Sequence, residues 1–502
     1  MKKESAESNI NPNIESHFAQ RWVRRLLGAF FRRIEVVGLE NIPQDRGGLL
    51  VSWHPNGMID PALMYATFPR NVVFGARHGL FKWPLLGWVM RKIGTVPIYR
   101  GQDLKHMPIE KQRELNQQSL DQLANCIAEG SFSALFPEGV SHDSPFLQQL
   151  KTGAARIFIA AQIKNQCHAQ AHPNLKPPVI IPVGLHYDAK ARFRSDVLIN
   201  FHPPIELPPD LENITDIQDR EAQQRLTDLI EETLTNVIFA TESWDLHHNF
   251  QRACLLLRAE RILQSGTIDS ASIEEKVIGL ARIWAGYHQK KDHNPELVQS
   301  VVDAVEQYRL DMEGLGLQDH ELDLDPQWIS WRVIFLSMLQ MLFVFLLLPP
   351  FVIVGYVINF PTASLIKLLS VKYSSQYKDQ ASVKLFASLA LYPLTWALWG
   401  GLAAFGYLNS TLLFPNLPNG EIAAGLFVSS LGIIGWLVMF VYVRAGKRTL
   451  RGLKVRWVKR HHQGYVEYLQ EERYRLATQL TQMAEGLDLP GKLGDNNRLE
   501  MD

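Results

Sequence analysis

The sequence predicts two architectures in one chain: an α/β domain in which helices flank a sheet, and a C-terminal helical domain embedded in a membrane. Up to about residue 208, short β-branched and apolar runs alternate with helical periodicity, which is typical of α/β domains. From residue 211 to about 325 the strand signals stop, and the segment is rich in Glu, Gln, Arg and Leu, as in helices. Beyond residue 333, long runs carry no charge, as in membrane-spanning segments.

The α/β domain is expected at residues 34–208, followed by a helical linker at residues 209–330. Short β-branched or apolar runs predict strands at residues 34–37, 49–53, 72–75, 95–99, 133–136, 179–183 and 197–201. Helical patterns between them include residues 61–67, 109–129 and 153–164.

An N-terminal basic amphipathic helix is expected within residues 1–33. Between residues 18 and 33, five arginines alternate with aromatic residues and leucines. Such a helix either lies on an anionic bilayer surface, or covers the core with one face and leaves a solvated basic face outside. The first twenty residues lack the apolar core of a signal peptide.

Uncharged runs place a transmembrane domain at residues 331–445. Residues 385–407 and 422–443 are each expected to span the bilayer, which requires about 20 apolar residues. The run at 333–366 is interrupted by Pro349 and Pro350, which remove two amide donors and break the helix into halves of about 16 residues, each too short to cross alone. A re-entrant or shallow hairpin is therefore expected there, with a kinked single span as the alternative.

Charges beside these runs predict the orientation. Between residues 332 and 460, thirteen Lys and Arg residues stand against two acidic residues. By the positive-inside rule, the 367–384 loop and the basic helical tail at residues 446–502 lie in the cytoplasm, and the 409–421 connection lies outside. The chain is thus expected to be an integral membrane protein whose N-terminal domain faces the cytoplasm.

Composition excludes several classes of protein. The 502 residues are 46% hydrophobic and 20% charged, which excludes a disordered or collagen-like chain. Lys and Arg equal Asp and Glu at 51 each, which argues against a protein that coats nucleic acid. Three widely separated cysteines predict neither a disulfide framework nor a spaced metal cage.

The densest cluster of reactive side chains is Val51-Ser-Trp-His-Pro-Asn-Gly-Met-Ile-Asp60-Pro61. A predicted strand ends near His54, and ligands of α/β sheets bind at strand carboxyl ends. The imidazole of a histidine can take a proton from an alcohol, and a carboxylate on its other nitrogen fixes the tautomer. His54 and Asp60 are therefore a candidate base and its partner, although a histidine and an aspartate at this spacing are more often structural.

Three further segments follow predicted strands. In Gly94-Thr-Val-Pro-Ile-Tyr-Arg100, the guanidinium suits phosphate oxygens. In Phe136-Pro-Glu-Gly139-Val-Ser141-His142, the glycine allows a turn that exposes backbone donors and the serine. The third segment, Val179-Ile-Ile-Pro-Val-Gly184-Leu-His-Tyr187, is a buried strand.

In this order and at these intervals, the four segments resemble the blocks of the glycerolipid acyltransferase family, which includes glycerol-3-phosphate and lysophosphatidate acyltransferases. The resemblance covers about residues 34–204, and the stretch from Phe136 to Ala155 is closest to the branch that acts on glycerol 3-phosphate or dihydroxyacetone phosphate. It implies a mixed sheet flanked by helices and acyl transfer from a coenzyme A or carrier-protein thioester to a glycerol hydroxyl. It further implies His54 as the base, Asp60 as its partner, and acceptor contacts by Arg100, Glu138, Gly139 and Ser141.

No cofactor or metal is expected, because a thioester is already activated. The enzyme has only to deprotonate the acceptor hydroxyl, align it with the thioester and stabilise the oxyanion. The expected partners are the acyl thioester, the glycerol-phosphate acceptor and the lipid bilayer, and not nucleic acid.

The family's common motif has four residues between His and Asp, whereas residues 55–59 make five here, as in the glycerol-3-phosphate branch. Lysophosphatidate acyltransferases usually carry an arginine after Glu-Gly, where Val140, Ser141 and His142 stand here.

Two alternatives stay open at this point. One is an enzyme that acylates 1-acylglycerol 3-phosphate or another lysophospholipid. The other is a catalytically inactive membrane scaffold with the same fold.

Overall fold

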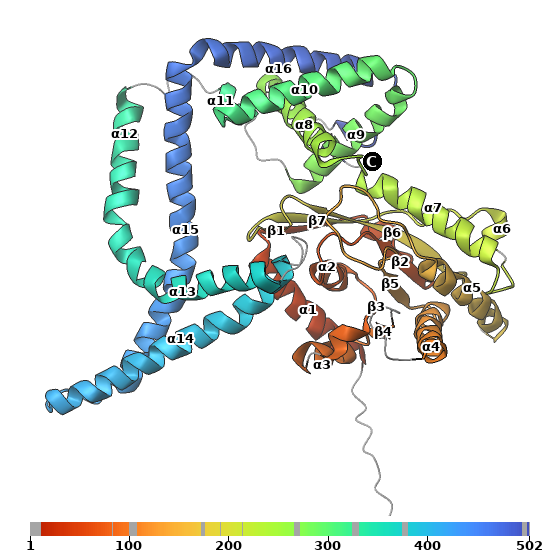
Figure 1. Ribbon diagram of the computed structural model, residues 1–502, viewed down its shortest axis with the longest axis horizontal. Helices are drawn as coiled ribbons and strands as arrows, with labels where there is room; N and C mark the ends of the chain where they lie inside the picture. The colour runs from red at the N-terminus through yellow and green to blue at the C-terminus, as the bar shows by residue number, and fades with distance from the viewer. Residues whose placement is uncertain are drawn as a thin grey trace, which may run out of the picture. The chain divides into compact units, whose positions relative to one another are not determined.

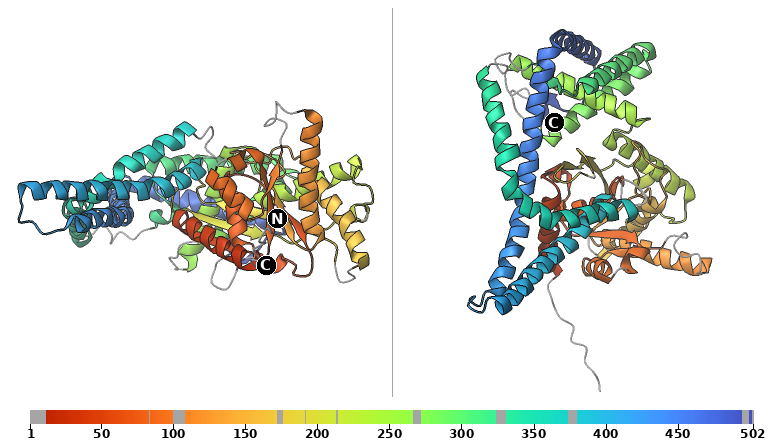
Figure 2. Two further views of the ribbon diagram at one scale, coloured as in Figure 1. Left: turned by 90° about the horizontal axis from the view of Figure 1, so that it is seen from below. Right: turned by 60° about the vertical axis from the view of Figure 1, so that its left-hand side comes forward.

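The computed structural model describes residues 12–82, 84–99, 108–171, 176–190, 192–212, 214–265, 272–323, 331–373, 380–493 and 499–500. The chain divides into two compact units, which we describe separately. The first runs to Trp244 and takes in Ser272–Val277, and the second holds most of the remaining residues. Figures 1 and 2 show a sheet with helices in the first unit and helices in the second.

A seven-stranded mixed sheet forms the centre of the first unit, in the order β1-β7-β6-β2-β5-β3-β4. The pair β6·β7 is antiparallel and every other neighbouring pair is parallel. The strands are β1 Arg33–Val37, β2 Gly48–Ser52, β3 Val72–Arg77, β4 Val96–Ile98, β5 Phe132–Leu135, β6 Val179–Tyr187 and β7 Asp196–Phe201. The predicted mixed α/β class and all seven predicted strands are therefore confirmed.

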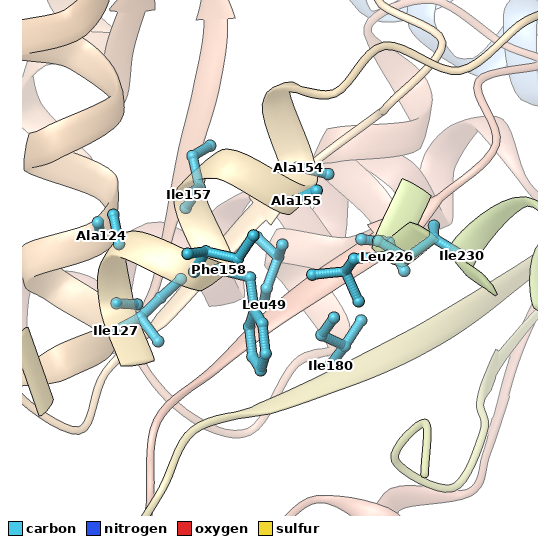
Figure 3. Close-up of a cluster of buried hydrophobic side chains, with 14 of the residues drawn as sticks. Leu49, Ala124, Ile127, Ala154, Ala155, Ile157, Phe158, Ile180, Leu226 and Ile230 are labelled. Carbon is cyan, nitrogen blue, oxygen red and sulfur yellow. The ribbon is translucent and has the colours of Figure 1, made fainter. Parts of the chain in front are cut away.

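Helices α4 (Ile109–Ala128), α5 (Gly153–Ala171) and α7 (Arg220–Ile238) cover one face of the sheet. Their apolar residues pack with Leu49 of β2 and Ile180 of β6 in one buried cluster, where Phe158 of α5 is fully buried (Figure 3). Removal of these apolar side chains from water is the main stabilising contribution to this layer. The central strand β2, buried at all five positions, is thereby held rigidly.

Helices α1 (Pro12–Phe30) and α2 (Ile59–Thr67) pack against each other in the first unit. Phe68, at the end of α2, meets the rings of Phe132 and Phe201 on two different strands. In α1, Leu27 and Phe30 are buried, whereas Trp22 is 53% exposed and Arg21, Arg24 and Arg25 are also exposed. One face of the expected amphipathic helix thus covers the core, and its basic outer face stays available to a bilayer surface.

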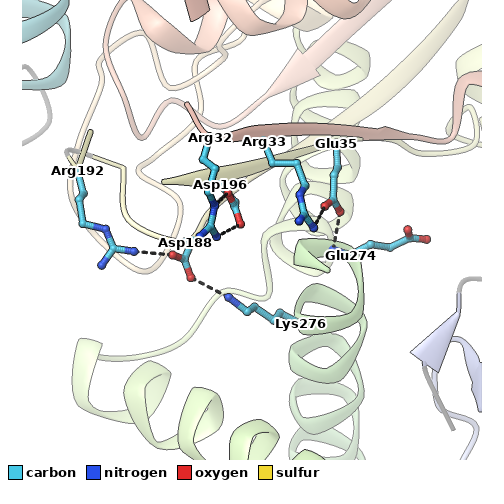
Figure 4. Close-up of polar contacts among 8 residues, drawn as sticks. All are labelled: Arg32, Arg33, Glu35, Asp188, Arg192, Asp196, Glu274 and Lys276. Atoms are coloured by element: carbon cyan, nitrogen blue, oxygen red, sulfur yellow. Dashed lines mark hydrogen bonds and ion pairs between the residues drawn. The ribbon is translucent and has the colours of Figure 1, made fainter. Parts of the chain in front are cut away.

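The first turn of α9 (Ile273–Lys291) belongs to the first unit and is held by polar contacts. Lys276 bonds to Asp188 at 3.0 Å, and the Glu274 amide donates to Glu35 of β1 at 3.2 Å (Figure 4). In the same cluster, Arg32 pairs with Asp196 of β7, and this pairing lowers the pKa of Asp196.

Helices of the second unit enclose a buried ionic cluster. They are α8 (Trp244–Ser265), α9, α10 (Pro295–Leu315), α11 (Asp319–Leu322) and α16 (Gln463–Ala484). Arg473 of α16 is fully buried and bonds to Glu260 at 2.6 Å and to Asp323 at 2.8 Å. Because both carboxylates compensate the buried guanidinium, it locks these helices together rather than marking an open site.

Three helical segments of the second unit are long and apolar enough to cross a membrane: Val352–Lys372, Val383–Leu413 and Glu421–His461. A preceding helix, α12 (Trp331–Leu342), continues through a π-helical turn, Phe343–Leu347, and α13 (Pro349–Tyr373) begins at the predicted break. The expectation that both halves are too short is wrong for the second half, because α13 continues through Lys367 and Lys372, whose long side chains can place their charge at a membrane surface. Whether residues 333–366 span or re-enter stays a prediction, as do the expected domain boundaries.

Close backbone contacts join α13 and α15 (Glu421–His461). A Cβ on Gly355 would lie 2.4 Å from the Cα of Gly435, so only glycine fits at this crossing. The Asn359 amide donates to the Gly432 carbonyl at 2.9 Å and accepts from the Trp396 indole at 2.9 Å. Small residues and satisfied polar groups of this kind hold helices together in lipid.

Candidate active site

Three neighbouring parallel strands bring the predicted site residues to one edge of the sheet. β2 lies between β5 and β6, with Val51 opposite Leu135 and Ser52 opposite Val183. Parallel strands end at the same edge, where α/β sheets bind ligands. The segments that follow β2 and β5, containing His54 and Glu138, therefore lie side by side.

His54 and Asp60 form the expected pair. His54 Nδ1 lies 2.8 Å from Asp60 Oδ2, with Asp60 at the start of α2. The Asp60 side chain is fully buried, whereas that of His54 is 17% exposed. The His54 ring also stacks on Phe136 at a centroid distance of 4.1 Å, which fixes its plane. Because a carboxylate only accepts hydrogen bonds, Nδ1 carries the proton and Nε2 keeps its lone pair.

Two further donors hold the Asp60 carboxylate. The backbone N–H of Asn56 donates to Oδ2 at 2.7 Å, and the Tyr187 hydroxyl donates to Oδ1. Burial and the neighbouring Asp60 charge raise the pKa of Tyr187 well above its ordinary value, so the phenol keeps its proton. The carboxylate is thus oriented by three donors. Five residues separate His54 from Asp60, one more than in the common family motif, and the turn that they form places the Asn56 backbone amide on Asp60.

Glu138 lies inside the structure and joins two loops. Its Oε1 accepts a hydrogen bond from the backbone N–H of His54 at 3.0 Å, and its Oε2 accepts one from the backbone N–H of Gln148 at 2.9 Å. His142 Nε2 also contacts Oε2. Since the Ser144 backbone amide donates to His142 Nδ1 at 3.1 Å, the proton of the neutral ring lies on Nε2, next to the carboxylate. These contacts make Glu138 a residue that positions His54, and its expected contact with an acceptor stays a prediction.

Three predicted site residues remain: Gly139, Ser141 and Arg100. Gly139 adopts φ +67° and its amide donates to the Phe136 carbonyl at 3.0 Å, as expected for a turn glycine. Ser141 is half-buried two residues later. Arg100 lies outside the described residues, so its expected contact with a phosphate stays a prediction.

Sequence reasoning gave no role to Tyr187 or His142, although both lie in motif segments. Tyr187 ends β6, so its position at a strand end was the available signal. His142 lies four residues after Glu138, and only the tertiary structure shows that it turns back to that carboxylate.

Comparison with known proteins accounts for most of the chain. Residues 33–186 match the profile of the Acyltransferase family, and residues 256–488 match that of the glycerol-3-phosphate acyltransferase 2 C-terminal domain. Residues 33–186 thus form a domain of the Acyltransferase family, and residues 256–488 resemble the C-terminal domain of glycerol-3-phosphate acyltransferase 2. The first match contains His54, Asp60 and Glu138, and the second contains the membrane-capable helices.

Two curated relatives are distant in sequence from this chain. An uncharacterized acyltransferase of Schizosaccharomyces pombe is 25% identical over 391 residues, which are 73% of this chain and 53% of the relative. Glycerol-3-phosphate O-acyltransferase 2 of Saccharomyces cerevisiae is 24% identical over 314 residues, 62% of this chain and 39% of the relative. The chain thus spans about half or less of the length of these two relatives.

Two further matches are to proteins named for another acceptor. A chloroplastic 1-acyl-sn-glycerol-3-phosphate acyltransferase of Arabidopsis thaliana is 29% identical over 146 residues, 28% of this chain and 36% of the relative. A crystal structure of a 1-acyl-sn-glycerophosphate acyltransferase from Thermotoga maritima is 19% identical, covers 45% of this chain and 79% of that chain, and has a TM-score of 0.32.

Proposed function

We propose that this protein is a membrane-anchored O-acyltransferase of phospholipid biosynthesis. It moves a fatty acyl group from an acyl thioester to a hydroxyl of glycerol 3-phosphate or dihydroxyacetone phosphate. The observation that carries the proposal is the 2.8 Å contact between His54 Nδ1 and the buried Asp60 carboxylate, which accepts three hydrogen bonds. A partly exposed imidazole held in one tautomer is suited to act as a general base.

In the proposed reaction, His54 Nε2 removes the proton from the acceptor hydroxyl as the oxygen attacks the thioester carbonyl carbon. The tetrahedral intermediate then collapses, the C–S bond breaks, and the leaving thiolate takes the proton from the imidazolium. Asp60 stabilises that imidazolium through Nδ1. No acyl-enzyme is required, because the thioester is already activated.

Acceptor contacts are assigned to Arg100, Glu138, Gly139 and Ser141, and the donor is acyl-CoA or an acyl carrier protein, with no further cofactor. The match to glycerol-3-phosphate O-acyltransferase 2 of Saccharomyces cerevisiae supports glycerol 3-phosphate as the acceptor. The Arabidopsis match keeps 1-acylglycerol 3-phosphate as a second candidate.

The membrane-capable helices support an integral membrane location, and the basic segments beside them support a catalytic domain on the cytoplasmic side. Labelling an engineered cysteine just before Arg332 from either side of sealed vesicles tests this orientation.

A panel of acceptors tests the proposed function. Membranes that carry the protein are supplied with labelled acyl-CoA and, in separate reactions, with glycerol 3-phosphate, dihydroxyacetone phosphate or lysophosphatidate. Labelled product with either of the first two acceptors is expected. Label only in phosphatidate would select the second candidate, and no transfer to any acceptor would favour an inactive scaffold.

Replacing Arg100 with alanine should raise the acceptor KM about 10- to 100-fold, since a hydrogen bond between charged groups is worth about 1.5–3 kcal/mol. The KM for acyl-CoA should change far less. Steady-state kinetics with each substrate varied in turn provides the measurement, and an unchanged acceptor KM would remove Arg100 from the phosphate site.

Replacing Tyr187 with phenylalanine should lower kcat about tenfold and leave both KM values nearly unchanged, because Asp60 loses one of its three donors while no substrate contact is lost. Since the pKa of Tyr187 is raised, its ionised form is populated only above the ordinary range, and the wild-type rate should show no loss from this group between pH 7 and about pH 10. A pH profile of both forms checks this, and a wild-type decline there that the variant lacks would contradict it.

A further inference from the structure

Lys151 folds back over the Glu138-Gly139 turn. A Cβ built on Gly139 would lie 2.9 Å from Lys151 Nζ, 3.2 Å from its Cδ and 3.3 Å from its Cε. The Lys151 amide donates to the Pro137 carbonyl at 3.0 Å, which fixes the start of this side chain beside the turn. Glycine at position 139 therefore serves two purposes, because it permits φ +67° and leaves the space that the lysine occupies.

The Lys151 ammonium is exposed and has no counter-ion in the part of the chain that the structure describes, where no carboxylate lies within 4.0 Å. The neighbouring carboxylate, Glu138, is buried, accepts hydrogen bonds from the His54 and Gln148 backbone amides and contacts the His142 ring. The turn therefore presents a positive charge that its own acidic residue does not neutralise.

The turn beneath the ammonium is bonded to the backbone of the candidate base. Glu138, which precedes Gly139, bonds directly to the His54 amide, and the His142 amide donates to the His54 carbonyl at 3.1 Å. Helix α5 begins two residues after Lys151, and the positive end of its dipole has the same sign as the ammonium. An anionic group held at this lysine thus lies beside the turn whose Glu138 bonds to the His54 backbone.

We propose that Lys151 binds a phosphate group of a substrate across the Gly139 turn. This inference rests on the proposed function and names a binding residue for it. The phosphate belongs to the acceptor or to coenzyme A, and the two sources are separated by experiment.

Kinetics of Lys151→Gln in the full chain provide the first test. We expect the KM of the substrate whose phosphate is bound to rise about 10- to 100-fold, as for the loss of one charge-assisted hydrogen bond, while Lys151→Arg stays within a few-fold of wild type. The matched control is Lys164→Gln on α5, whose ammonium instead bonds to Asn125 at 2.7 Å. A rise confined to the acceptor KM identifies the acceptor phosphate, and a rise confined to the acyl-CoA KM identifies coenzyme A.

Gly139→Ala provides a second variant. Its new Cβ displaces the Lys151 side chain, so the same KM should rise, and the double variant with Lys151→Gln should be no worse than the more impaired single variant. Unchanged KM values for both substrates in Lys151→Gln would overturn the proposal.

Chemical labelling separates this inference from the proposed function, since it needs no turnover. Wild-type protein is treated with an amine-acetylating reagent, and modification of Lys151 and Lys164 is followed by mass spectrometry. Glycerol 3-phosphate or coenzyme A should slow labelling of Lys151 at least threefold and leave Lys164 unchanged. Equal labelling of Lys151 with and without both ligands would refute the site even if acyl transfer is observed, whereas protection without acyl transfer would refute only the proposed function.

Discussion

Replacing His54 with alanine is expected to lower the rate of acyl transfer about 10³-fold while the protein still folds and inserts into membranes. General-base assistance contributes about 10²–10⁴-fold to the rate, and among the described residues no other imidazole is hydrogen-bonded to Asp60. The side chain is 17% exposed and stacks on Phe136, so its loss leaves a partly solvated gap rather than a sealed core cavity. The initial rate of labelled product formation measures the effect.

His168→Ala is the matched control, because His168 is exposed near the end of α5. It should keep wild-type activity. A His54→Ala variant that retains more than about a tenth of the wild-type rate would mean that another group removes the proton.

Replacing Asp60 with asparagine is expected to have the second large effect, a fall in kcat of about 10²–10⁴-fold. Losses of this size occur when the carboxylate that orients a catalytic histidine is replaced by an amide. The carboxylate accepts from His54 Nδ1, from the Asn56 amide and from Tyr187. An asparagine offers one accepting oxygen and a nitrogen that only donates, so at least one of these donors loses its acceptor and the His54 tautomer is no longer fixed. KM values should change little, because Asp60 is fully buried.

Coupling between the two residues distinguishes this account from simple destabilisation. Since Asp60 acts through His54, the double variant His54→Ala/Asp60→Asn should be no slower than His54→Ala alone. Circular dichroism and membrane insertion of Asp60→Asn serve as controls for folding. Multiplicative losses in the double variant would show that Asp60 contributes independently of the imidazole.

Local patterns predicted the elements of the first unit well. The apolar run of β2 and the β-branched residues of β6 indicate strands in the sequence itself, as expected for strands that are buried on both faces of a sheet. The pairing of His54 with Asp60 was also accessible, because the two residues are six positions apart and belong to one strand-turn-helix segment.

Long-range contacts could not be predicted in the same way. The inward direction of Glu138, the bond from Tyr187 to Asp60 and the return of Lys151 over Gly139 depend on how separate segments fold back together. The length of α13 was underestimated for a different reason. The prediction ended the apolar segment before Lys367, whereas the helix extends beyond both this lysine and Lys372.

The central claim is that His54 activates a glycerol-phosphate hydroxyl against an acyl thioester. The most direct measurement supplies labelled acyl-CoA and glycerol 3-phosphate to the purified full chain in lipid vesicles, for wild type and His54→Ala in parallel. The account predicts labelled 1-acylglycerol 3-phosphate from the wild type and about 10³-fold less from the variant. Equal product from both proteins would contradict it.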